Sequence, residues 1–308
     1  MRDRAGHFWL TIASAILVAG CGGPRAEPEV MWGRQGVQDG DFAKPRAIAI
    51  DAQDRLYIVD FTARIQVFDR DGKYLGITWT TPDFRNGRPS GLSIDRDGNL
   101  LVSDSHYHCL RIYSIAGGKA VEVRKIGGEV GTQPGQFAYI CDAVQDSDGY
   151  FYIGEFGENQ RITKLDSDGN LVKCWGSPGS EQGQFSRIRA LALGPDGLLY
   201  VADACNHRIQ VFSRDGDFVR AWGGEGDQLG RFRYPYDLAF DPKGNLFVVE
   251  FGNHRVQKFS KEGEWLGAWG GPGHQSGKLH HPWGLAVDSR GKVHVIDSQN
   301  HRVQRISF

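Results

Sequence analysis

An all-β fold, in which six four-stranded blades close into a ring, is predicted from three observations in the sequence. Glycine makes up 42 of the 308 residues, about twice its usual share, so the chain must turn often. Apolar and polar residues alternate in short runs, a pattern typical of strands. A signature also recurs six times, at intervals of 44 to 51 residues. About four strands in such a period match one blade of a β-propeller.

Each repeat contains an opening residue, which starts an apolar strand, and an acidic residue, which ends the next strand. In all six repeats the acid follows the opening residue by 15 positions. The opening residues are Pro45, Pro89, Ile140, Ile188, Pro235 and Pro282, and the acids are Asp60, Asp104, Glu155, Asp203, Glu250 and Asp297. The length differences fall between these signatures, where loops accept insertions.

The last three acids are followed by the words Asn-His-Arg-Ile-Gln or Asn-His-Arg-Val-Gln, at 206–210, 253–257 and 300–304. On this motif, the segment from about Val30 to Phe308 resembles the NHL-repeat family of propellers. The resemblance implies a six-bladed ring used as a binding or scaffold module.

The N-terminal segment is expected to close this ring. The chain stops after the third strand of the sixth repeat, so that blade lacks its outermost strand. Met31-Trp32-Gly33 matches Ala268-Trp269-Gly270, which ends the fourth strand of the fifth repeat. We therefore predict a single domain over residues 29–308, in which the first strand completes blade 6 and removes the open edges.

The first residues are typical of an exported lipoprotein. A short basic start, an apolar stretch and Val18-Ala19-Gly20-Cys21 predict a signal peptide over residues 1–20 and a lipidated Cys21. Residues 21–28 then form a tether that anchors the protein to a membrane of the bacterial cell envelope, on the periplasmic side or in the outer membrane. The alternatives are an ordinary cleaved signal or a short anchor.

Charge is expected to differ between the two faces of the ring. The chain has 36 basic and 37 acidic residues, which excludes a globally basic nucleic-acid binder. Because neighbouring strands run antiparallel, the opening residues and the loops between second and third strands share one face, called the top face. The Asp-Gly hairpin turns share the other, the bottom face, which is predicted to be acidic. The candidate ligand-binding residues on a basic, aromatic top face are Arg46, Arg88, Asp142, Arg187, Arg189, Arg233, Tyr236, Asp237, His281 and Trp283.

Arginines beside aromatic rings suit an anionic or carbohydrate ligand, through bidentate hydrogen bonds and ring stacking. An envelope protein or peptide is the other kind of partner expected. Export argues against RNA, although some NHL propellers bind it with a basic top face. We expect a monomer, and the alternative for this face is an ordinary mixed surface.

Three recurring groups could bind metals, but a structural role is expected for each. The six acids should accept hydrogen bonds from backbone N–H groups of the following turn. The histidines that share one repeat position lie on different blades, too far apart for one zinc ion to bind several of them. The Asp-x-Asp-Gly turns lack the glutamate that closes a calcium loop. The histidines that share one repeat position are His108, His207, His254 and His301. No cofactor is therefore expected, with zinc or calcium as the alternative.

Four cysteines remain after Cys21, and in an exported protein they can pair. These are Cys109, Cys141, Cys174 and Cys205. We expect at least one disulfide, with Cys174 to Cys205 across neighbouring blades as one choice. The alternatives are the other pairings and a four-cysteine zinc site.

A top-face enzyme is the alternative to a binding module. The chain has a distant resemblance to the peptidyl-hydroxyglycine amidating lyase, which implies a zinc held by three histidines beside an arginine and a tyrosine. Arg46, Arg189 and Tyr236 would fit the last two roles. The residues that follow the opening residues include no histidine; they are Arg46, Ser90, Cys141, Arg189, Tyr236 and Trp283. A lactonase-like propeller would instead hold calcium by carboxylates and amides.

Overall fold

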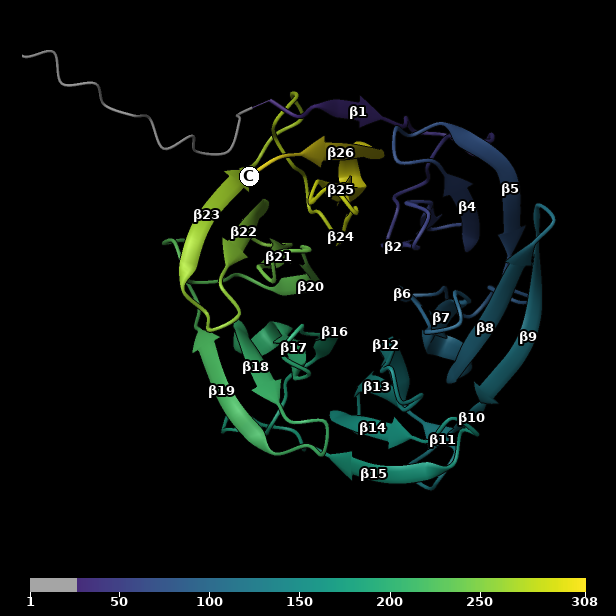
Figure 1. Cartoon of the computed structure of the whole chain (residues 1–308), viewed down its shortest axis with the longest axis vertical. Helices are drawn as coiled ribbons and strands as arrows, with labels where there is room; N and C mark the ends of the chain where they lie inside the picture. Colours follow the sequence, from purple (N-terminus) through teal and green to yellow (C-terminus); the bar gives the residue numbers. More distant parts are fainter. Residues whose placement is uncertain (1–26) are drawn as a thin grey trace, which may run out of the picture.

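The structure is a computed structural model that describes residues 27–308, and it shows six four-stranded antiparallel sheets arranged around a central axis (Figure 1). Blade 1 comprises β2 (Ala47–Ile50), β3 (Leu56–Val59), β4 (Arg64–Phe68) and β5 (Tyr74–Thr80). Blade 2 comprises β6 (Gly91–Ile94), β7 (Leu100–Asp104), β8 (Cys109–Ala116) and β9 (Lys119–Gly127). Blade 3 comprises β12 (Tyr139–Gln145), β13 (Phe151–Phe156), β14 (Arg161–Leu165) and β15 (Leu171–Trp175).

The remaining blades follow the same order from the channel outward. Blade 4 comprises β16 (Ile188–Leu193), β17 (Leu199–Asp203), β18 (Arg208–Phe212) and β19 (Phe218–Gly223). Blade 5 comprises β20 (Pro235–Phe240), β21 (Leu246–Glu250), β22 (Arg255–Phe259) and β23 (Trp265–Gly270). Blade 6 comprises β24 (Gly284–Val287), β25 (Val293–Asp297), β26 (Arg302–Ile306) and β1 (Val30–Trp32). A short pair, β10 (Glu129–Val130) and β11 (Gln136–Phe137), precedes blade 3, and three 3-10 turns follow the second strands of blades 2, 4 and 6 at Ser105–Tyr107, Ala204–Asn206 and Ser298–Asn300.

The predicted closure of the ring is confirmed. β1 runs antiparallel to β26, with Val30 opposite Arg305 and Trp32 opposite Val303, so the N-terminal strand is the outermost strand of blade 6. The Trp32 ring lies 5.5 Å from that of Phe42 and 4.6 Å from that of Phe68, both buried in blade 1 and the loop before it. The closing strand therefore joins the first and last blades through aromatic packing as well as through backbone hydrogen bonds.

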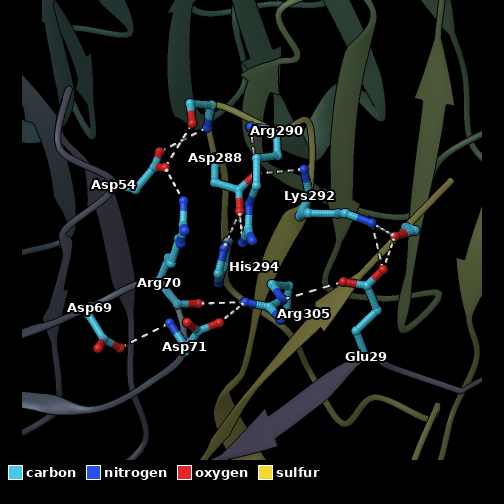
Figure 2. Close-up of polar contacts among 12 residues, drawn as sticks. Glu29, Asp54, Asp69, Arg70, Asp71, Asp288, Arg290, Lys292, His294 and Arg305 are labelled. Atoms are coloured by element: carbon cyan, nitrogen blue, oxygen red, sulfur yellow. Dashed lines mark hydrogen bonds and ion pairs between the residues drawn. The ribbon is translucent and has the colours of Figure 1, made fainter.

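A polar network reinforces this seam on the bottom face (Figure 2). Lys292 Nζ donates to Glu29 at 2.6 Å, and Arg305 donates to Asp71 at 2.5 Å. Asp54, from the first hairpin of blade 1, accepts hydrogen bonds from the backbone N–H and the hydroxyl of Ser289 in blade 6. These contacts confirm that the closing strand starts at the bottom face.

The chain before this strand does not leave straight from the bottom face. Ser276 Oγ, in the loop that follows β23, donates to Glu27 at 2.5 Å, so residue 27 lies at the side of the ring between blades 5 and 6. The predicted signal segment and Cys21 lie outside the described residues. No helix within residues 27–308 is long and apolar enough to cross a membrane.

The hydrophobic core is divided among the spaces between neighbouring blades. One cluster, for example, joins Tyr200 and Ala202 of blade 4 to Leu246, Val248 and Phe259 of blade 5, all of which are buried. Each blade therefore uses both sheet faces for burial, which explains why the second strands read as nearly continuous apolar runs.

The recurring acids are structural, as expected. Asp60 accepts the backbone N–H of Thr62 in the following turn, as predicted, but in the other blades the partners differ. Glu250 accepts from the side chains of Asn253, Arg255 and Gln257, the polar members of its own Asn-His-Arg-Val-Gln word. It also accepts from the backbone N–H of Arg233, which precedes the blade rather than following the acid. The motif thus satisfies a buried carboxylate and holds the loop before the blade against its second strand.

The recurring histidines join neighbouring blades. Nδ1 of His207 accepts the backbone N–H of Tyr234 at 3.1 Å, and Nδ1 of His254 accepts that of His281 at 2.9 Å. In blade 3 the side-chain oxygen of Gln160 takes this role and accepts the N–H of Arg187 at 2.7 Å. Because each histidine bonds to the next blade, the structural interpretation of these residues holds.

The bottom face is mixed in charge rather than acidic. The Asp-Gly turn carboxylates accept hydrogen bonds within their own hairpins, as Asp95 does from Asp97 and Asn99. Many of them also form ion pairs with basic residues of the same face, which the prediction of an acidic face did not consider. Arg214, for example, lies 2.8 Å from Asp148. Neighbouring basic residues therefore neutralise much of this face.

The expected disulfide is wrong. Cys109 and Cys141 are buried, Cys174 is half-buried and Cys205 is exposed, and all four are free thiols. Cys141 belongs to the innermost strand of blade 3 and Cys174 to the outermost, while Cys205 lies in the top loop of blade 4. The four cysteines lie on inner strands, outer strands and a loop of their blades. Neighbouring blades therefore do not bring the sulfur atoms close enough to form a disulfide.

Candidate functional site: the channel mouth

A bulge at the start of the innermost strand positions the residue after the opening residue in blades 3, 4 and 5. In blade 4, Ile188 lies opposite Asp203 and Ala190 opposite Ala202, so Arg189 has no partner across the ladder. The same register shift leaves Cys141 in blade 3 and Tyr236 in blade 5 without a partner on the neighbouring strand. A bulge turns a side chain away from the regular alternation, and here it directs Arg189 and Tyr236 into the mouth, while Cys141 is buried in the core between blades 3 and 4.

Two arginines from opposite blades meet over one tryptophan. The guanidinium carbon of Arg46, in blade 1, lies 4.6 Å from the Trp283 ring centroid, and that of Arg189, in blade 4, lies 5.2 Å from it. Arg189 also lies 4.6 Å from the centroid of Tyr236. The aromatic rings of blades 5 and 6 therefore hold both cations in place.

Neither guanidinium has an acceptor among the described residues. Arg189 is only 6% exposed, yet its Nε and that of Arg46 are buried without a hydrogen-bond partner. Burial, together with the charges of Arg189 and Arg88, lowers the pKa of Arg46 to about 9, which leaves it cationic at neutral pH. Two mutually repelling cations, one buried and one half-buried, therefore form a site in which a ligand anion would satisfy unmet charge and hydrogen bonds.

Two carboxyl groups lie just below the arginines. Asp142 of β12 accepts the backbone N–H groups of Ala143 and, in the next blade, Leu191, both at 2.9 Å. Asp237 of β20 accepts those of Leu238 and Leu285 at 2.8 and 2.9 Å. Each aspartate thus connects the innermost strands of two neighbouring blades.

Burial governs the protonation of both acids. It raises the pKa of Asp237 to about 7, although the two N–H donors and Arg189 act in the opposite direction. Burial and the nearby Asp237 raise the pKa of Asp142 well above its usual value. Below pH 7 Asp237 is therefore mostly protonated and does not offset the positive charges of Arg46 and Arg189 at the mouth.

Six of the ten candidate residues line one small pocket at this mouth. The six are Arg46, Asp142, Arg189, Tyr236, Asp237 and Trp283. Below the two acids the channel continues between apolar side chains such as Ile50, Val144 and Phe240. The site is therefore cationic and aromatic at the mouth, acidic beneath it and apolar further down.

The other four candidates lie around the mouth. Arg88 donates to the carbonyl of Phe61, and Arg187 and Arg233 are exposed. The backbone N–H of His281 donates to Nδ1 of His254, and the His281 ring packs against Phe251. The structure thus places these residues on the top face but outside the pocket.

Sequence reasoning missed the phenylalanines of the top face. Phe61, Phe156 and Phe251 each follow the acid of their repeat, and all three contact candidate residues. The sequence contained a pattern that could have identified them, because the residue after the acid alternates between a large and a small side chain around the ring. In order, these residues are Phe61, Ser105, Phe156, Ala204, Phe251 and Ser298.

Within residues 27–308, no group of three or more His, Cys, Asp or Glu side chains is arranged to hold a metal ion. The mouth instead offers arginines, aromatic rings and two carboxyl groups that are already bonded to backbone N–H groups. The donor set at this mouth suits an anion rather than a cation.

Taken together, the sheet order and the central channel define the chain as a six-bladed β-propeller. The model of the NHL repeat matches residues 86–113, 185–212, 232–259 and 279–306, which belong to blades 2, 4, 5 and 6. The chain is thus a propeller that contains NHL repeats.

Curated relatives match only part of the chain. Peptidyl-glycine alpha-amidating monooxygenase A of Xenopus laevis is 33% identical over 128 residues, which cover 39% of this chain and 14% of that protein. The rat peptidylglycine alpha-amidating monooxygenase is 37% identical over 129 residues, covering 39% and 13%. NHL repeat-containing protein 3 of Mus musculus is 33% identical over 172 residues, covering 52% and 49%. The expected distant similarity to amidating enzymes is confirmed, and it spans a small part of their length.

Solved structures share the fold. A streptogramin B lyase superposes with a TM-score of 0.62 at 14% identity and covers 89% of this chain and 95% of its own. A Bacteroides thetaiotaomicron protein of unknown function gives a TM-score of 0.67 at 14% identity, with 91% and 75% covered. At this identity the likeness shows the propeller fold alone.

Proposed function

We propose that this protein is a binding propeller that captures an anionic ligand at the channel mouth. The observation that carries the proposal is the pair of guanidinium groups of Arg46 and Arg189, whose Nε atoms are buried and have no acceptor among the described residues. Bidentate hydrogen bonds from arginine to a carboxylate or phosphate, made away from water, are strong and directional. Trp283 and Tyr236 hold the two cations before the ligand arrives, which lowers the entropy cost of binding.

A thermal-shift panel with acetate, phosphate, citrate and galacturonate tests this proposal. At least one of these anions should raise the melting temperature of the purified protein. The double variant Arg46→Met/Arg189→Met should lose that shift, and the bottom-face variant Arg214→Met should keep it. The proposal fails if no anion in the panel stabilises the protein, or if the double variant responds as the wild type does.

We further propose that the propeller is anchored to an envelope membrane through lipidated Cys21. The small-residue word before Cys21 supports this. Glu27 lies six positions after Cys21 in the sequence, and an extended chain of that length reaches roughly 20 Å. Because Glu27 lies beside blades 5 and 6, that edge of the ring would lie close to the membrane. Mass spectrometry should find a diacylated or triacylated N-terminal cysteine in the membrane fraction; an unmodified wild-type protein, or a Cys21→Ala variant that stays in that fraction, would contradict the anchor.

Asp237 supports a second candidate, an enzyme of the lyase or lactonase type with its active site at the same mouth. Its pKa of about 7 suits general acid–base catalysis, and Tyr236 and Arg189 line the same pocket. Metal content separates the two functions. Stoichiometric zinc or calcium that only strong chelation removes would favour the enzyme, and metal-free protein that still captures an anion would favour the binding module.

A further inference from the structure

The top face has an approximate three-fold pattern within its six-fold ring. Phenylalanine follows the acid in blades 1, 3 and 5, while serine or alanine occupies that position in blades 2, 4 and 6. Each phenylalanine contacts the residue that precedes the opening residue of the next blade. The guanidinium of Arg88 lies 4.3 Å from the Phe61 centroid, that of Arg187 lies 5.5 Å from Phe156, and the His281 ring lies 4.4 Å from Phe251.

A second side chain, from the phenylalanine's own blade, completes each group. Arg46 lies 5.5 Å from the centroid of Phe61, while Tyr139 stacks on Phe156 at 5.2 Å and Tyr236 stacks on Phe251 at 4.6 Å. We name these groups the three aromatic–basic stations; they lie between blades 1 and 2, 3 and 4, and 5 and 6. They surround the pocket and share Arg46 and Tyr236 with it.

The first two stations keep both charge and aromatic surface available. The guanidinium of Arg187 makes no hydrogen bond or ion pair within the described chain, and that of Arg88 bonds only to a backbone carbonyl. Phe61 is 43% exposed and Tyr139 is 39% exposed. A ligand can therefore reach a cation and a ring face at each of these two stations. At the third station burial and the charge of His280 lower the pKa of His281, so this station offers aromatic surface without a cation near neutral pH.

The outer part of the top face is mixed in charge. The loops between the fourth strands and the next blades carry the exposed acids Asp39, Glu129, Glu181 and Glu225 and the exposed bases Arg34, Arg85, Arg231 and Lys278. The cations that lie against aromatic rings are instead grouped around the pocket; they are Arg46, Arg88, Arg187 and Arg189. A ligand that uses this group is therefore a short oligomer rather than a long polymer.

We propose that this inner ring binds a short acidic oligosaccharide built from uronate units. One carboxylate would bind between Arg46 and Arg189, while further carboxylates bind Arg88 and Arg187. A uronate carries its carboxylate and an apolar C–H face on one rigid ring, so a station with a cation beside an exposed aromatic ring can contact both. An acidic peptide carries its carboxylates on flexible stems and has no such face. This inference rests on the proposed anion site and names the ligand class.

Calorimetric titration of the purified protein with galacturonate, trigalacturonate and triglutamate tests the inference. We expect trigalacturonate to bind at least about 10-fold more tightly than the monomer, because the second and third units bind within one molecule. The variant Arg88→Met/Arg187→Met should lose this advantage and bind the trimer no more tightly than it binds the monomer. Arg214→Met on the bottom face is the control and should behave as the wild type does.

The outcomes separate this inference from the proposed function. If the trimer has no advantage, or triglutamate gains as much as trigalacturonate, the oligosaccharide is overturned while anion capture by Arg46 and Arg189 stands. If the advantage persists in Arg88→Met/Arg187→Met, the stations do not bind the ligand. If no anion in the earlier panel binds and trigalacturonate does not bind, both proposals fail.

Discussion

Arg189 is buried in the propeller, and its Nε has no hydrogen-bond partner among the described residues. Replacing this side chain distinguishes a structural role of Arg189 from a role in ligand binding. Arg189→Met keeps the apolar stem and removes a buried, unpaired charge, so the free energy of unfolding should stay the same or rise. Affinity for a captured anion should fall about 10- to 100-fold, the value of a charge-assisted hydrogen bond. Chemical denaturation and titration measure the two effects. A clear loss of stability with unchanged affinity would make Arg189 structural.

Asp237 should make the stability depend on pH. Because its pKa rises from 3.8 to about 7, the folded state keeps a proton that the unfolded chain has already released. The free energy of unfolding should therefore fall as the pH rises from about 4 to above 7, by up to roughly 4 kcal/mol.

In Asp237→Asn that slope should decrease, and in the exposed hairpin variant Asp168→Asn it should not. Urea denaturation between pH 4 and 8 measures it. An equal slope in wild type and Asp237→Asn would show that the carboxyl ionises normally in the fold.

At the scale of the element, the closing strand should contribute far more than its three residues suggest. Trp32→Ala removes a ring that packs between Phe42 and Phe68, so we expect the free energy of unfolding to fall by about 3 kcal/mol. Trp265→Ala, on the outermost strand of blade 5 and 42% exposed, is the matched control and should cost less than about 1 kcal/mol. Equal losses would mean that the ring does not depend on its N-terminal strand.

The elements that the sequence predicted well are those with a repeated physical requirement. The spacing between opening residue and acid found every second strand. In blades 3, 4 and 5 the acid faces its opening residue across the ladder, as Asp203 faces Ile188. Spacing alone did not reveal the partners of that acid. The Asn, Arg and Gln side chains lie three, five and seven residues further on and approach the carboxylate only once the third strand has folded back.

At the scale of the whole molecule, the ring and its closure are confirmed, and the prediction of the site was partial. Six candidates meet in one pocket because they occupy equivalent or adjacent positions at the start of the innermost strands, which the repeat arithmetic identifies. The bulges that turn Arg189 and Tyr236 into the mouth left no mark in the apolar pattern. The disulfide prediction failed because the position of a cysteine in the repeat predicts the face of the ring on which it lies. It does not predict whether the cysteine lies on an inner or an outer strand of its blade.

Calorimetric titration with galacturonate at pH 6 and pH 8 tests the central claim of anion capture most directly, using wild type and Arg46→Met/Arg189→Met. The wild type should bind, and more weakly at pH 8, because Asp237 ionises beneath the site and repels the anion. The double variant should show no binding at either pH. Failure of the wild type to bind galacturonate or any other anion of the thermal-shift panel, or equal affinity in the two proteins, would contradict the assignment of the channel mouth as an anion site.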